Sequence, residues 1–340
     1  ATVPKVSKWA PYYYFKHEPG RHTLVLADSI AAHAAAPGYE EVPYYPPELT
    51  ERRERDYLDD WQVAEEITSD AYMLDDYEFT TPRADRKARL AASGTALHEV
   101  YDYPGGYEQA THGETYVRVR LEELQAQRVR FEGFGNARGL ACGALFKLIE
   151  HPEADQNRDY LITRAEYAIE TTDYESGKQA KAEPAYRCSL VAIDSKIPYR
   201  LPRITPRPIV RGPQTALVVG KSGEDIWTDE HGRVKVQFPW DRRGANDENS
   251  SCWVRVAQLW AGGGFGAIHI PRIGQEVIVD FLEGDPNRPI VTGRVYNGDQ
   301  MPPYELPGNQ TQSGVKSQST PGGGVAESNE LRFEDKQGEE

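Results

Sequence analysis

Apolar and polar residues alternate along short segments between residues 229 and 296, which is typical of β-strands with one buried face. The clearest segment carries apolar residues at every second position: Val234, Val236, Phe238 and Trp240. Gly, Pro, Asp and Asn residues predict turns at 241–249, 262–264 and 283–289. Together with residues 215–220, the block predicts five main strands, which favours a small closed barrel over an open sheet covered by helices.

The beginning of the chain predicts a β-hairpin over residues 15–26. Pro19 and Gly20 supply a tight turn, and Leu24 and Leu26 occupy alternate positions of the return strand. The following residues, 31–50, are rich in Ala, Pro and Tyr and predict an irregular loop.

One α-helix is predicted clearly, over residues 113–127. Its apolar stripe at helical spacing consists of Val117, Leu121 and Leu124. Glu114 lies four residues before Arg118, the favourable order for an ion pair on a helix surface.

Further strands are predicted after this helix, at 129–133, 160–170 and 187–194. The apolar face of the second of these is predicted to hold Leu161, Thr163, Ala165, Tyr167 and Ile169. Residues 197–213 hold five prolines without periodicity and predict a linker. Three regions result: 1–205, 206–297 and 298–340, the last too polar to form a core alone.

Composition limits the possible classes of protein. The 340 residues suggest two or three domains, and 39% hydrophobic with 27% charged residues predicts a soluble globular protein. No run approaches the length of an apolar membrane helix, and no segment resembles a signal peptide. A net charge of −14 with scattered Lys and Arg argues against nucleic acid as a partner. Cys142, Cys188 and Cys252 are expected to be buried reduced thiols of a cytoplasmic protein.

Three motifs suggest cofactor or metal sites but lack the required spacing. Gly220-Lys221-Ser222 resembles the end of a phosphate-binding loop, but no earlier glycine and no following helix accompany it. The segment 262–266 lacks the dinucleotide-binding spacing and is expected to be a loop between strands. His17 and His22 are not four apart on a helix, because the Pro-Gly turn separates them. No cofactor and no metal ligand are therefore predicted.

Adjacent carboxylates are the remaining candidates for catalysis. The pairs Glu65-Glu66, Asp75-Asp76 and Asp247-Glu248 could supply the acid and base of a glycoside hydrolase. That chemistry needs one carboxyl in an apolar pocket, whereas these pairs lie in hydrophilic stretches and are expected to be solvated. No serine or cysteine nucleophile motif is present either. The sequence thus predicts no catalytic residue.

Several long segments closely resemble VgrG proteins, the trimeric spikes of bacterial type VI secretion systems. Segments 231–241 and 252–297 resemble the OB-fold domain of that family. The phage-tail-hub-like domain is represented by three segments: 12–29, 98–107 and 120–140. Residues 328–340 resemble the start of the C-terminal β-helix. The resemblance implies that a further barrel of the hub domain is absent or cut short at the beginning and that the long needle is missing.

The resemblance implies a mainly β fold with minor α. A phage-tail-hub-like β-barrel domain at 1–205 would precede a five-stranded OB-fold neck at 206–297 and the start of a β-helix needle at 298–340. It also implies a homotrimer that caps the hexameric inner tube, carries a tip-capping protein and effectors, and punctures a target membrane without enzymatic activity. Such a spike would assemble in the cytoplasm and be secreted without a signal peptide.

Two other functions stay open from the residues alone. A cell-wall glycoside hydrolase of a phage-tail-like particle would use one of the carboxylate pairs. An OB-type binder of oligosaccharides or single-stranded nucleic acid would use the aromatic residues, 20 Tyr and 6 Trp among them, although the charge of −14 disfavours nucleic acid.

Overall fold

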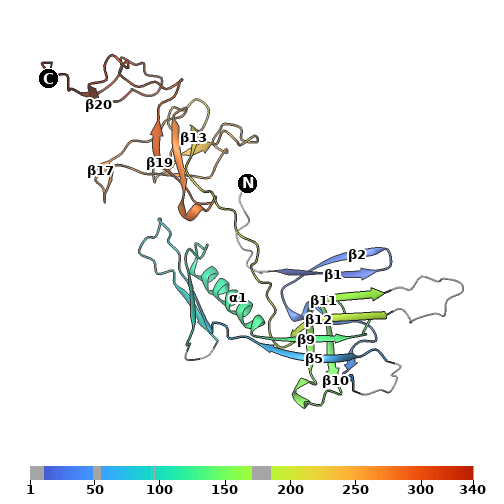
Figure 1. Cartoon of the computed structure of the whole chain (residues 1–340). Helices are drawn as coiled ribbons and strands as arrows, with labels where there is room; N and C mark the ends of the chain where they lie inside the picture. The colour runs from blue at the N-terminus through green and yellow to red at the C-terminus, as the bar shows by residue number, and fades with distance from the viewer. Residues whose placement is uncertain (1–10, 49–54, 93, 95, 171–184, 340) are drawn as a thin grey trace. The chain divides into compact units, whose positions relative to one another are not determined.

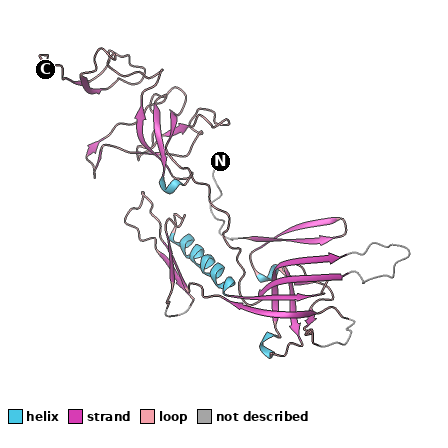
Figure 2. Cartoon of the chain, viewed as in Figure 1, coloured by secondary structure: helices cyan, strands magenta, loops and turns pink. Residues whose placement is uncertain are grey.

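The computed structural model describes residues 11–48, 55–92, 94, 96–170 and 185–339 of the chain (Figure 1). Contacts divide the chain into two compact units, an N-terminal unit of residues 4–204 and a C-terminal unit of residues 205–340. Strands dominate both units, and one long helix accompanies them in the N-terminal unit (Figure 2). The predicted class, mainly β with minor α, is confirmed.

A seven-stranded sheet forms the centre of the N-terminal unit. Its strand order is β3-β10-β11-β12-β9-β5, and β4 also pairs with β10. The bounds are β3 Ala34–Ala35, β4 Glu41–Pro43, β5 Leu58–Glu65, β9 Val129–Gly135, β10 Ala144–Ile149, β11 Asp159–Glu170 and β12 Ala185–Asp194. Because β3 and β4 fall within 31–50, the expectation of an irregular loop there was wrong in part. Their parallel pairing with β10 is a long-range contact that local composition does not report.

Aromatic rings fill the core of this sheet. Trp61 on β5 stacks on Phe131 of β9 at 5.7 Å between ring centroids, and Tyr160 of β11 meets Trp61 edge-on at 4.9 Å. The polar atoms of two of these rings share one partner. Gln156 accepts the Trp61 indole N–H at 3.2 Å through its side chain and the Tyr160 hydroxyl at 2.9 Å through its carbonyl. The rings therefore pack against one another, while the indole N–H of Trp61 and the hydroxyl of Tyr160 are both hydrogen-bonded.

Strand β11 contains a β-bulge that changes which residues face this core. The register with β12 shifts between Ile162 and Arg164, so Thr163 is an extra residue. Before the bulge Tyr160 and Ile162 belong to the core, and after it Ala165 packs there. The predicted apolar face began with Leu161 and Thr163 and was wrong up to the bulge, because one inserted residue reverses the alternation.

Helix α1, Ala110–Arg128, packs on a separate three-stranded sheet of order β7-β6-β8. These strands are β6 Ala71–Leu74, β7 Ala88–Ala91 and β8 Glu99–Asp102. The predicted stripe is confirmed, since Val117 and Leu121 are buried against Tyr72 and Leu74 and Leu124 packs beside them. The expected pairing of Arg118 with Glu114 was wrong. Arg118 instead contacts Glu122, one turn further along, at 3.0 Å.

The predicted hairpin near the beginning is confirmed as β1, Tyr12–Glu18, and β2, Arg21–Ala27. Gly20 adopts a φ of 73°, which a glycine at the second turn position after Pro19 accommodates without strain. One face of the hairpin is buried through Tyr12, Tyr14 and Ala27. The hydroxyl of Tyr12 lies 2.8 Å from Nε2 of the buried His33, whose Nδ1 lies 2.8 Å from the carbonyl of Gly143.

A five-stranded sheet of order β14-β13-β18-β19-β15 forms the centre of the C-terminal unit. Its strands are β13 Gln214–Val219, β14 Lys235–Gln237, β15 Arg255–Val256, β18 Glu276–Phe281 and β19 Pro289–Val295. Val234 and Val254, which directly precede the two outermost strands, exchange backbone hydrogen bonds of 2.9 and 2.8 Å. This bridge joins the two ends of the sheet and closes it into the predicted small barrel.

The barrel interior is almost entirely valine. Val234 and Val236 are buried as the alternation predicted, and Phe238 packs partly against the same core. Trp240 departs from the pattern, because β14 ends at Gln237 and Trp240 lies in the following turn. Its exposed indole donates a hydrogen bond of 2.8 Å to the side chain of Gln214. The strand therefore ends at Gln237, before the turn, whereas the alternation predicted that it would continue to Trp240.

Two further hairpins extend the C-terminal unit. Strands β16, Trp260–Ala261, and β17, Gly266–Ala267, flank the glycine-rich segment, and β20, Gln312–Lys316, pairs with β21, Glu330–Glu334. The interpretation of 262–266 as a loop between strands is thus confirmed. Short 3-10 turns complete the assignment at Ile30–Ala32, Ala154–Gln156 and Leu282–Gly284. None of the helices in the described part of the chain combines the length and the apolarity that crossing a membrane requires.

The three cysteines are free, but they are not all buried. Cys188 lies in the core of the seven-stranded sheet, whereas Cys142 and Cys252 are exposed. The expectation of burial was therefore wrong for two of the three. A small apolar side chain gives no local signal that separates a core strand from a surface turn.

Replacing Phe131 with alanine should destabilise the N-terminal unit by about 3–5 kcal/mol, because it removes a buried ring that stacks on Trp61 and meets Tyr160 edge-on. Chemical denaturation followed by tryptophan fluorescence measures the change. Phe15→Ala is the matched control. Its ring is exposed, so the change should stay within about 0.5 kcal/mol. Equal losses in the two variants would contradict this description of the core.

Candidate functional site

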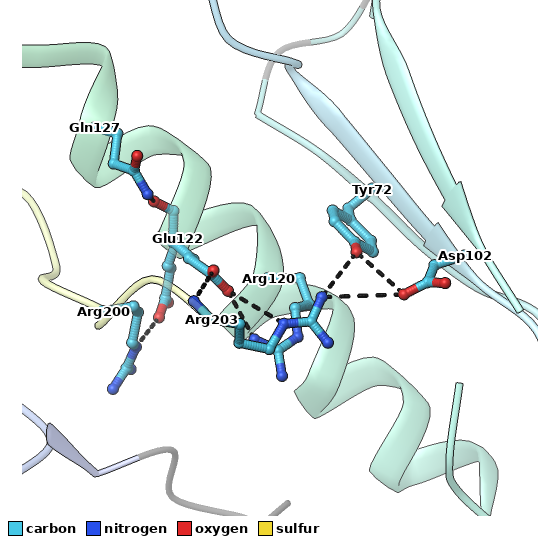
Figure 3. Close-up of polar contacts among 8 residues, drawn as sticks. Tyr72, Asp102, Arg120, Glu122, Gln127, Arg200 and Arg203 are labelled. Carbon is cyan, nitrogen blue, oxygen red and sulfur yellow. Dashed lines mark hydrogen bonds and ion pairs between the residues drawn. The ribbon is translucent and has the colours of Figure 1, made fainter. Parts of the chain in front are cut away.

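A network of charged side chains, most of them shielded from solvent, joins helix α1 to the segment 199–203, where the chain leaves the N-terminal unit (Figure 3). We call this network the clamp. Its members are Arg120, Glu122 and Glu123 on the helix and Arg200 and Arg203 on the segment. The segment is irregular and has no strand partner, so side chains supply its attachment.

Arg200 connects the helix to the hairpin. Its Nε donates to Glu122 at 2.7 Å, and its Nη1 donates to the backbone carbonyl of Asp28, just after β2, at 2.9 Å. The neighbouring Tyr199 meets Tyr12 of β1 edge-on, with ring centroids 4.9 Å apart. Tyr199 and Arg200 of this irregular segment thus contact both the β1–β2 hairpin and α1.

Arg203 connects the helix to the three-stranded sheet. Its backbone N–H donates to Glu123 at 2.9 Å, and its Nη2 donates to the Tyr72 hydroxyl at 3.3 Å, 3.9 Å from Asp102. Glu123 also accepts from Arg120 at 2.6 Å. Figure 3 shows Arg203 turned towards Tyr72 and Asp102, while Arg200 reaches Glu122.

Burial of two of the arginines means that their charges must be paired. Arg200 and Arg120 each retain only 8% of their exposed area. Removal from water lowers the pKa of Arg120 and raises the pKa of the Tyr72 hydroxyl. A buried charge without a partner is strongly unfavourable, so the guanidinium groups of Arg120 and Arg200 require their carboxylates. The clamp therefore fixes one position of the segment on the helix.

The chemistry of the clamp is structural. An acid–base pair needs a carboxyl that faces an open pocket, whereas Glu122 and Glu123 accept from different arginines. Adjacent residues of a helix point about 100° apart, which allows this division. The sequence reasoning missed the clamp, although two glutamates in the helix and an Arg-x-x-Arg motif within the predicted proline-rich linker were visible signals.

A second contact holds the segment 318–322 against the barrel. The Asp225 carboxylate accepts from the backbone N–H of Gly322 and from the Thr320 hydroxyl, each at 2.8 Å. Arg272 donates to the carbonyl of Gln318 at 2.7 Å. These hydrogen bonds, the one from Gly322 first, hold the pKa of Asp225 below its ordinary value of 3.8. The loop that connects β20 to β21 is thereby attached to the barrel.

The carboxylate pairs of the sequence lie apart and serve local contacts. Glu66 pairs with Arg130 at 3.4 Å on the surface. Asp76 accepts from the backbone N–H groups of Gly106 and Tyr107, at 2.7 and 3.1 Å, and so holds a loop. Asp247 accepts from the N–H of Asn249 within its own turn. In the described residues no group of three or more His, Cys, Asp or Glu side chains is placed to hold a metal ion.

The glycine motifs likewise belong to turns. Strand β13 ends at Val219, and residues 221–233 form turns and irregular chain where a phosphate-binding loop would need a helix. Lys221 lies over the Trp227 ring, with Nζ 5.9 Å from its centroid. In the segment 262–266, the N–H of Gly262 donates to the carbonyl of Phe265 at 2.8 Å and closes the hairpin loop.

Comparison with known proteins agrees with this arrangement. The profile described as phage tail baseplate hub matches residues 7–173, and the profile described as type VI secretion system/phage-baseplate injector OB domain matches residues 219–296. The protein is also 54% identical over 332 residues to the type VI secretion system spike protein VgrG1b of Pseudomonas aeruginosa, an alignment that covers 97% of this chain and 44% of the relative.

The chain belongs to the VgrG spike family. The VgrG1a spike protein of the same organism is 52% identical over 332 residues, covering 97% of this chain and 51% of that protein. This VgrG chain therefore spans about half the length of the curated relatives it matches. Both family members are named as spike proteins, which agrees with a site whose charges hold segments together.

A solved structure has a similar fold. The E. coli c3393 protein, described as a component of the type VI secretion system with structural similarity to the T4 bacteriophage tail proteins gp27 and gp5, matches with a TM-score of 0.50. The match covers 85% of this chain and 58% of that one at 18% identity, so it supports the fold alone. The predicted hub-like and OB folds are confirmed.

Arg200→Ala should loosen the clamp and cost about 2 kcal/mol, because Glu122 loses one of its two arginines and the Asp28 carbonyl loses its donor. Hydrogen exchange of residues 197–204 should accelerate together with the loss of stability in denaturation. The control is Arg89→Ala, which removes a surface ion pair with Glu99 and should cost below about 1 kcal/mol. Unchanged exchange in the Arg200 variant would contradict the role of the clamp.

Acid should release the segment 318–322 from the barrel. Because the pKa of Asp225 is depressed in the folded state, its contribution is present above about pH 4 and is lost as the pH falls through the folded value. Amide exchange at Gly322 should therefore rise at low pH in the wild-type chain. In Asp225→Asn it should be fast already at neutral pH and show no such step. A wild-type chain without the step would refute the contact.

Proposed function

We propose that this chain forms the hub and neck of a homotrimeric, membrane-puncturing type VI secretion spike. In this proposal residues 1–205 form the hub that caps the hexameric inner tube, 206–297 form the OB neck, and 298–340 begin the needle. The needle end would bind a tip-capping protein and effectors. The spike would assemble in the cytoplasm and then be ejected into the target cell.

The observation that carries the trimer is the exposed apolar hairpin β16–β17. Leu259 is 94% exposed, Ile268 71%, and Trp260 and Phe265 64% each. Trp260 and Phe265 contact each other edge-on at 5.7 Å between ring centroids, so the two rings form one surface. Contiguous apolar surface of this kind usually marks a protein interface, and aromatic residues are enriched in the buried centres of such interfaces.

The attachment of each segment supports a mechanical role. A spike must transmit force along the chain without local unfolding, and local opening occurs where few contacts hold a segment. The clamp secures the N-terminal unit where the linker begins, and the Asp225 contact secures the segment before β21. The carboxylates engaged in turns and ion pairs support a function without catalysis, in accord with the spike relatives.

Association should depend on the β16–β17 hairpin. The wild-type chain is expected to reach about three times its mass of 38.2 kDa in light scattering as the concentration rises. Trp260→Ser combined with Phe265→Ser should shift this equilibrium towards monomer, because the apolar surface is removed. Ile67→Ser is the control, since it removes an exposed apolar side chain from the N-terminal unit.

A chain that stays monomeric over the whole concentration range would contradict the trimer. A trimer that the double variant leaves unchanged would contradict the role of the hairpin while leaving the oligomeric state supported. Release of sugar fragments from peptidoglycan by the pure chain would contradict the absence of catalysis.

A further inference from the structure

The β1–β2 hairpin brings together two histidines that helical spacing could not. In the antiparallel register His17 lies directly opposite His22, one pair before Glu18 and Arg21 at the turn. Directly opposite residues on one face have neighbouring side chains. The Pro19–Gly20 turn, which rules out a helical metal motif, is the feature that creates this pairing.

The two imidazoles converge through the same atom. Nδ1 of His17 lies 2.8 Å from Nδ1 of His22, with ring centroids 4.8 Å apart and planes at 83°. Without a metal, a single proton can bridge the two nitrogens as a hydrogen bond. Both side chains are exposed, so solvent ligands can reach the remaining positions around an ion placed between them.

We propose that His17 and His22 form a two-histidine site for a divalent transition metal, with Cu²⁺ as the preferred ion and Ni²⁺ next. Imidazole nitrogens bind such ions at about 2.0–2.1 Å, so nitrogens 2.8 Å apart subtend about 86° at the metal. That angle fits two adjacent positions of a tetragonal centre, which Cu²⁺ and Ni²⁺ favour. Tetrahedral Zn²⁺ would require nitrogens about 3.3 Å apart at the same bond lengths.

The surroundings of the pair suit this site. By alternation the face that carries the histidines also carries four exposed apolar residues: Tyr13, Phe15, Leu24 and Leu26. Phe15 contacts the His17 ring at 6.2 Å between centroids and limits its freedom. The charged residues of the hairpin tip, Lys16, Glu18 and Arg21, fall on the opposite face by the same alternation. No cation of the hairpin is therefore directed at the metal position.

A bound metal would cross-link the two strands near their turn. Two ligands from rigid neighbouring strands are already positioned, so binding loses little side-chain freedom. The expected consequence is slower opening of the hairpin tip, next to the exposed apolar face. Metal binding by His17 and His22 needs only one chain and does not depend on the proposed spike function.

The test uses the full chain without a polyhistidine tag. Titration with Cu²⁺, Ni²⁺ and Zn²⁺ separately, followed by calorimetry, should show one site with Cu²⁺ bound most tightly. Electron paramagnetic resonance of the Cu²⁺ complex should show two equivalent nitrogen ligands. His17→Ala and His22→Ala should each weaken Cu²⁺ binding by at least about tenfold and remove one nitrogen from the spectrum.

His269→Ala is the matched control, because it removes an exposed histidine from the C-terminal unit and should leave binding unchanged. Circular dichroism confirms that each variant is folded. Binding that is equally tight in the wild type and both hairpin variants would overturn the site. Preference for Zn²⁺ over Cu²⁺ would overturn the geometry from which the metal was chosen.

Discussion

Pairing of buried charges holds the N-terminal unit in one arrangement. Arg200 and Arg203 lie where the irregular segment meets α1, and the buried Arg200 must face a carboxylate because burial removes the alternative of hydration. The same two residues also contact Asp28 beyond β2 and Tyr72 on β6. The hairpin, the helix and the three-stranded sheet are therefore positioned by one short stretch of chain. Apolar packing alone would tolerate sliding, whereas directed hydrogen bonds do not.

Local patterning was sufficient for the elements that bury one regular face. Val234 and Val236 enter the barrel core because nothing interrupts their alternation, and Val117 and Leu121 follow the helical period. The patterns predicted the wrong face where a β-bulge or a turn interrupted the alternation of a strand. Thr163 is one extra residue in β11, and the turn after Gln237 directs Trp240 to solvent. Threonine is an ordinary strand residue, so the bulge has no strong signature in residue type, whereas Pro239 directly before Trp240 is a residue that ends strands.

The candidate site was harder to predict than the fold, for a different reason. Glu122 and Glu123 look like a solvated surface pair, and only the return of the chain at residues 200–203 buries them. That contact spans about eighty positions of sequence, and no periodicity encodes it. The histidine pair shows the opposite case, because its partners are five residues apart and the turn alone brings them together. The sequence shows both histidines and the turn residues between them, but the spacing of metal ligands on a helix does not describe ligands on the two strands of a hairpin.

Closure of the barrel by Val234 and Val254 has a consequence for crowding. An open sheet presents unpaired N–H and C=O groups, to which a strand of another molecule can add. Here the residues beside β14 and β15 satisfy each other, so this sheet offers little edge to a neighbouring copy. Copies of the chain at high concentration can then meet through side chains without exchanging strands of this sheet. The two backbone hydrogen bonds between Val234 and Val254 that close the barrel thus also prevent a strand of another copy from pairing with it there.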